Sequence, residues 1–70
     1  MTGPTPAPDS DAMRKLRHDL SNPLAAILAE TQLLLLDEAN LDAETVEGLR
    51  EIEALARRMR EMLAATRAAG

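Results

Sequence analysis

Apolar residues recur at spacings of three and four over two long stretches of the chain, which is the pattern of amphipathic α-helices. In the first stretch, about residues 10–37, the recurring positions are Met13, Leu16, Leu20, Leu24, Ile27, Leu28, Thr31, Leu34 and Leu35. In the second, about residues 42–68, they are Val46, Leu49, Ile52, Ala56, Met59, Leu63 and Thr66, flanked by Leu55 and Met62. The pattern predicts two helices, the first about 40 Å long.

The connection between these helices, about residues 38–41, is short enough to force the second helix to return antiparallel to the first. Asp42 is the predicted N-cap of the second helix, and Leu41 can pack on Val46 as a hydrophobic staple. Gly48 is a weak point, since glycine costs a helix about 1 kcal/mol relative to alanine. The predicted fold is all-α, an antiparallel helical hairpin.

Two local features affect where the first helix begins. Residues 1–8 contain three prolines within five positions and are predicted to be a disordered lead, which leaves residues 9–70 as the folded domain, with Asp9 or Ser10 as N-cap. Pro23 lies inside the helical pattern and would kink it. The alternative is that a helix starts at Pro23 with Asn22 or Ser21 as its N-cap. The apolar register passes through Pro23 without a break, which favours one kinked helix.

Composition narrows the class of protein. The 70-residue chain has no aromatic residue and no cysteine, so its core must be aliphatic, as suits helices packed on helices, and a disulfide framework is excluded. A net charge of −4 argues against binding to nucleic acid. No apolar run approaches the ~20 residues of a membrane span, and no signal peptide is recognisable. We therefore expect a cytoplasmic segment without membrane contact.

The size of the chain bears on its assembly. A domain of this length is marginal for a self-sufficient core, and a lone hairpin would leave many of its apolar side chains half exposed. Pairing two hairpins would bury the second side of each apolar stripe. The sequence thus predicts a homodimeric four-helix bundle.

The segment from His18 to Leu24 reads His-Asp-Leu-Ser-Asn-Pro-Leu and contains the only histidine. An imidazole can be phosphorylated on a ring nitrogen, and the neighbouring Asp19 carboxylate can take its proton or fix its tautomer. The amide of Asn22, four residues on, can orient a water or a phosphoryl oxygen. His18 lies two residues from both Leu16 and Leu20, so it points away from the apolar stripe. The alternative is a solvated surface histidine without chemistry.

This segment resembles the phosphoacceptor box of sensor histidine kinases, whose pattern is His-(Glu/Asp)-x-x-(Thr/Asn)-Pro-Leu, and every keyed position is met. The resemblance to their dimerisation and histidine-phosphotransfer domain extends over about residues 13–67. It implies that His18 accepts a phosphoryl group and exchanges it with an aspartate of a response-regulator receiver domain. It also implies that Asn22 positions the attacking water when the receiver is dephosphorylated. Arg17 departs from the serine that often precedes the histidine.

Small and apolar residues follow His18 along the same side of the helix. They are Ala25, Ala26, Ala29, Leu33 and Leu36. The resemblance implies that a receiver domain docks on them. Two alternatives stay open. Alanine is common in helices for its propensity alone, and the end of a bundle nearest the connection could bury the whole run Leu33–Leu36.

The sequence up to Gly70 contains no recognisable ATP-binding domain. We therefore expect no cofactor in this chain and no autonomous kinase activity, with ATP and Mg²⁺ entering only through a separate histidine-kinase catalytic domain. The predicted function is that of a phosphoryl carrier, either a free-standing phosphotransfer protein or the phosphoacceptor domain of a sensor kinase. The competing hypothesis is a purely structural helical-hairpin dimerisation module.

Overall fold

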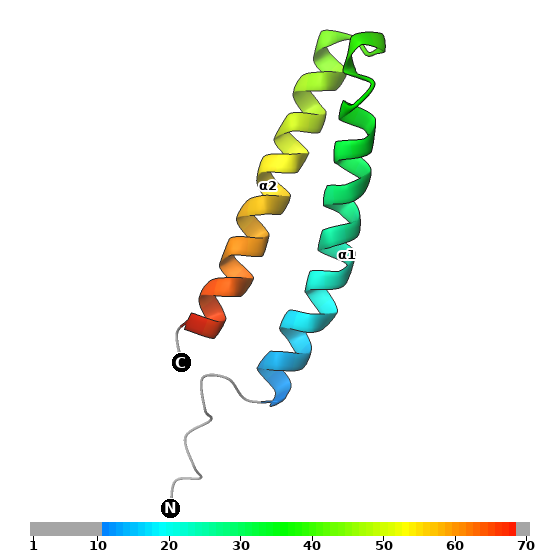
Figure 1. Ribbon diagram of the computed structural model, residues 1–70. Coiled ribbons are helices and arrows are strands. Elements are labelled where there is room, and N and C mark those ends of the chain that lie inside the picture. The colour runs from blue at the N-terminus through cyan, green and yellow to red at the C-terminus, as the bar shows by residue number, and fades with distance from the viewer. Residues whose placement is uncertain (1–10, 69–70) are drawn as a thin grey trace, which may run out of the picture.

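The computed structural model describes residues 11–68, which form a hairpin of two antiparallel α-helices (Figure 1). Helix α1 spans Asp11–Leu35 and helix α2 spans Ala43–Ala68, with the short 3-10 helix η1, Glu38–Asn40, between them. No strand occurs within the described part of the chain, and the predicted all-α hairpin is confirmed. The lead predicted at residues 1–8, the N-cap at Asp9 or Ser10 and residues 69–70 lie outside the described residues.

The connection is a series of tight turns. Helix α1 ends at Leu35, two residues before the predicted end, since Asp37 N–H donates to the Leu34 carbonyl three residues back (3.1 Å) rather than four. The same i→i−3 pattern continues in η1, where Asn40 N–H donates to Asp37 O (2.9 Å) and Leu41 N–H to Glu38 O (3.0 Å). Tighter turns of this kind satisfy backbone groups that the end of a helix would otherwise leave unpaired.

Asp42 caps the start of α2, as the sequence predicts. Its carboxylate Oδ1 accepts a hydrogen bond from the Thr45 backbone N–H at 2.7 Å, and its carbonyl accepts one from Val46 at 3.1 Å. Hydrogen bonds from Thr45, through its side chain and its backbone, hold the pKa of the Asp42 carboxyl below its usual value. Leu41 and Val46 are both half-buried and line one hollow, in the arrangement of a hydrophobic staple.

Pro23 lies inside α1, which continues through it as one helix. The alternative in which a helix starts at Pro23 is therefore wrong for this chain. Arg17 before the proline and Leu24 and Leu28 after it are buried at spacings of seven and four, so the same line of side chains faces α2 on both sides of Pro23. A kink at Pro23 stays a prediction.

The core between the two helices is small. It consists of Leu24, Leu28 and Ala56, with the half-buried Leu63 packed against them. Thr31 is also buried, and its hydroxyl donates to the Ile27 carbonyl at 2.6 Å. One pair of helices can bury only one narrow line of side chains per helix. Much of the predicted apolar stripe therefore remains exposed in the single hairpin.

Eight of the ten exposed large apolar side chains within residues 11–68 recur at helical spacing and form an apolar face along the hairpin. We define this face by Leu16, Leu20, Ile27 and Leu34 of α1 and Ile52, Leu55, Met59 and Met62 of α2. The two helices contribute jointly to it, because Leu20, Pro23 and Ile27 line the same hollow as Met59 and Met62. Each member of the face is more than 40% exposed, with Leu20 the least at 42%. A patch of this kind marks a surface for another protein or a second copy.

Replacement of Gly48 by alanine is expected to stabilise the hairpin. A β-carbon added at Gly48 has no atom within 4 Å, so the change costs no packing and α2 gains the propensity difference of about 1 kcal/mol. Urea denaturation should show a higher midpoint at an unchanged slope. A lower midpoint would mean that another chain approaches α2 closely at Gly48.

Candidate functional site

His18 lies in the second turn of α1, at the open end of the hairpin opposite η1. Its side chain is 75% exposed. Because Leu16 and Leu20 of the apolar face lie two residues to either side, the imidazole projects nearly opposite to that face. A macromolecule or a small phosphoryl donor can therefore reach His18 whether or not the apolar face is covered.

Asp19 is held between His18 and a lysine. Its Oδ2 accepts a hydrogen bond from Lys15 Nζ at 2.9 Å, and its Oδ1 lies 3.7 Å from His18 Nδ1. In this arrangement the carboxylate lies beside the Nδ1 edge of the imidazole, which leaves Nε2 as the ring nitrogen turned away from Asp19. The 3.7 Å separation from Nδ1 is longer than a hydrogen bond, so the carboxylate is a close neighbour of the imidazole in this structure.

Asn22 follows His18 by one helical turn and is exposed. Since α1 continues without a break through residues 21–23, Asn22 is not an N-cap, and that alternative is wrong. No hydrogen bond within residues 11–68 engages its amide, which is therefore available to a bound molecule.

The five candidate docking residues all lie at the surface. Ala25, Ala26, Ala29 and Leu33 are exposed on α1, and Leu36 is exposed just beyond its end. Leu33 is 59% and Leu36 84% exposed, whereas Leu35 between them is half-buried. In the single hairpin none of Leu33–Leu36 is fully buried, and burial of the whole run in a bundle stays a prediction.

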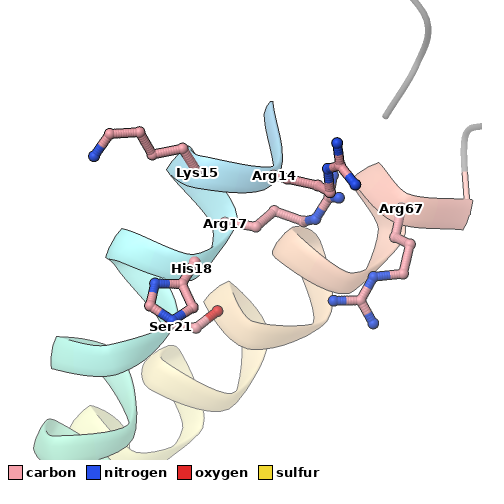
Figure 2. A pocket seen from close by; sticks show the side chains of 6 residues that line it. All are labelled: Arg14, Lys15, Arg17, His18, Ser21 and Arg67. Atoms are coloured by element: carbon pink, nitrogen blue, oxygen red, sulfur yellow. The ribbon is translucent and has the colours of Figure 1, made fainter. Parts of the chain in front are cut away.

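Sequence reasoning missed the role of Arg17. Its side chain is 5% exposed, lies between the helices and donates from Nη1 to Thr66 Oγ1 of α2 at 3.4 Å. Arg17 precedes Leu24 by seven residues, which is two helical turns, so its place in the buried register was a usable signal. Together with Arg67 of α2 it lines a hollow that also contains His18 and Ser21 (Figure 2).

Comparison with known families now identifies the domain. Residues 10–68 match the family model of the His Kinase A (phospho-acceptor) domain, and the chain belongs to this family. No curated protein and no solved structure gave a significant match to it. Membership confirms the resemblance inferred from the box at His18 and defines the chain as a phosphoacceptor domain of the two-component histidine kinase type.

Two further observations concern residues 11–68. Neither helix has a window apolar enough, over the length required, to cross a bilayer. Within the same residues, no three His, Cys, Asp or Glu side chains gather in a way that could hold a metal ion.

Proposed function

We propose that the chain accepts a phosphoryl group on His18 and exchanges it with an aspartate of a response-regulator receiver domain. The observation that carries this proposal is an exposed imidazole with a carboxylate 3.7 Å from its Nδ1, inside a chain of the phosphoacceptor family. ATP and Mg²⁺ would be supplied by a separate catalytic domain when the phosphoryl group comes from ATP.

The chemistry needs one nucleophile and one proton acceptor. The Nε2 lone pair of His18 attacks the phosphorus of the aspartyl phosphate, and the bond from phosphorus to the receiver carboxylate breaks with its electron pair on that carboxylate. The imidazole becomes cationic as the N–P bond forms, and its Nδ1 proton passes to Asp19 or is stabilised by it. The reverse sequence returns the phosphoryl group to the receiver.

The proposed docking surface is the strip of Ala25, Ala26, Ala29, Leu33 and Leu36. Small side chains allow a helix of the receiver to approach α1 closely, and the exposed Leu33 and Leu36 can act as apolar anchors. The strip lies between His18 and η1 along the same helix (Figure 1), so a receiver docked there would bring its aspartate toward the imidazole.

We also propose that a second copy covers the apolar face. Domains of this family typically dimerise, and two hairpins joined through this face would form a four-helix bundle with a shared aliphatic core. A purely structural dimerisation module would use the same face. That second candidate function differs from the first only in leaving His18 without chemistry.

Phosphotransfer profiling tests the proposal. The chain is incubated with each phosphorylated receiver domain of the host, and acid-labile phosphate on the chain is measured against time. We expect rapid transfer from one or a few receivers and none to a His18→Gln variant with unchanged helicity. If no receiver transfers to the wild type, the structural module is the better account.

Asn22→Ala is expected to separate two activities. His18 should remain phosphorylatable, because Asn22 is exposed and contributes nothing to the core. Dephosphorylation of the receiver should be lost if the Asn22 amide positions the attacking water, as an amide does in other phosphoryl hydrolases. A phosphatase time course measures the effect, with Glu30→Ala, which removes another exposed polar side chain of α1, as the control. Full phosphatase activity in Asn22→Ala would show that the Asn22 amide does not position the attacking water.

A further inference from the structure

The open end of the hairpin is basic although the chain as a whole is acidic. The net charge is −4, yet four of the eight lysines and arginines line one hollow beside His18. The lining residues are Arg14, Lys15, Arg17, His18, Ser21 and Arg67. Asp11 and Asp19 pair with Arg14 and Lys15, but both pairs are exposed and therefore weak, so the described side chains around the hollow carry an excess of positive charge that attracts anions.

Two of the four cations turn toward α2. Figure 2 shows Arg14 and Arg17 extending from α1 toward the end of α2, where Arg67 is located, whereas Lys15 points away from them. The direction of Lys15 agrees with its hydrogen bond to Asp19. The hollow is therefore lined by arginines of both helices, and a bound anion would reduce the repulsion between their charges.

The three arginines differ in how firmly they are held. Arg17 is buried and bonded to Thr66 Oγ1, whose own hydroxyl donates to the Leu63 carbonyl at 2.6 Å, so its position is fixed. Arg14 forms an ion pair with Asp11, but Asp11 is 94% exposed, and exposed pairs of this kind are weak. Arg67 is exposed in the last turn of α2. The Arg14 and Arg67 side chains can thus move to contact an anion that is bound to the fixed Arg17.

We propose that Arg14, Arg17 and Arg67 form a clamp for the phosphoryl group that arrives at or leaves His18. Guanidinium groups bind phosphoryl oxygens through paired, charge-assisted hydrogen bonds, and the Ser21 hydroxyl in the same hollow can donate another. The clamp deepens the proposed function, on which it rests, by assigning binding of the phosphoryl oxygens to residues outside the His18 box. Because Arg67 belongs to α2, the clamp requires the start of α1 and the end of α2 to lie side by side.

The first test measures anion binding without any transfer. The full chain is titrated with inorganic phosphate at constant ionic strength while amide and side-chain NMR shifts are followed. We expect saturable shifts at Arg14, Arg17, Ser21 and Arg67, and their loss in Arg14→Ala/Arg67→Ala. Arg58→Ala, which removes an exposed α2 arginine outside the hollow, should bind as the wild type does. Equal binding by the double variant, or shifts spread over all arginines, would overturn the clamp.

The second test measures transfer from phosphoramidate, a small donor that needs no partner protein. His18 Nε2 takes the phosphoryl group, the P–N bond of the donor breaks, and ammonia leaves. Each single variant, Arg14→Ala or Arg67→Ala, should be phosphorylated about tenfold more slowly, the size of one charge-assisted hydrogen bond. Arg67→Lys should recover part of the rate, and Arg58→Ala should match the wild type.

The outcomes separate the clamp from the function on which it rests. If His18 is phosphorylated at equal rates in all variants, the clamp is wrong and the proposed function stands. If phosphate binds in the hollow and the double variant abolishes it, but His18 is phosphorylated by neither phosphoramidate nor any receiver, the anion site stands and the proposed function is wrong. Both arginines are exposed, so their replacement leaves the core of the hairpin intact.

Discussion

Ile27→Glu is expected to convert a dimer of about twice the 7.6 kDa chain mass into a monomer. In the single hairpin Ile27 is 48% exposed, so the carboxylate costs little there. In a bundle built on the apolar face the same carboxylate would be buried without a partner, twice per dimer by symmetry. An unpaired buried charge costs several kcal/mol, so the dissociation constant should rise about a thousandfold or more.

Sedimentation equilibrium at micromolar concentration measures this effect. Ala54→Glu is the matched control, since it adds the same charge to an exposed position of α2 outside the apolar face and should remain dimeric. Met59→Glu should act like Ile27→Glu, because both side chains line the same hollow. A wild type that is a cooperatively folded monomer would contradict the bundle.

Asp19→Asn is expected to slow phosphorylation of His18 by roughly 10²–10⁴-fold, the usual contribution of a general base. The carboxylate lies 3.7 Å from Nδ1, and an amide in its place can neither take the proton nor balance the imidazolium charge. The side chain is 53% exposed, so helicity and dimerisation should be unchanged.

The rate of transfer from a phosphorylated receiver measures the role of Asp19. Glu30→Gln, which neutralises another exposed carboxylate of α1, is the control and should react as the wild type does. A wild-type rate in Asp19→Asn would show that Asp19 only pairs with Lys15.

The elements of the fold could be predicted because their signals are local. The spacing of apolar residues gives both helices, the Asp42 cap requires only its neighbour Thr45, and the unbroken register across Pro23 distinguishes one helix from two. The predicted end of α1 is two residues too late. The Leu33–Leu36 run continues the apolar pattern into tight turns that have no local sequence signal of their own.

Which apolar residues are buried could not be predicted in the same way. Leu24 and Ile27 belong to one amphipathic stripe, yet Leu24 is 4% exposed and Ile27 48%. Periodicity identifies a stripe but not which of its edges meets the other helix, since that depends on how the two helices are rotated against each other. The exposed edge is the one that a second hairpin can cover.

The candidate site likewise has one part that local sequence signals predict and another that depends on how the two helices pack. His18, Asp19 and Asn22 are contiguous on one helix, so a motif could identify them. Arg17 and Arg67 are 50 positions apart in the sequence. That they line one hollow depends on the register of α1 against α2. The docking strip, by contrast, remains a prediction until a receiver is bound.

Mass spectrometry of the phosphorylated chain tests most directly whether His18 carries the phosphoryl group. After incubation with a phosphorylated receiver, the account predicts one phosphoryl group per chain, located on His18, lost in acid and retained in alkali. Phosphate that survives acid, or that maps to Ser21 or Thr31 with His18 unmodified, would contradict the account.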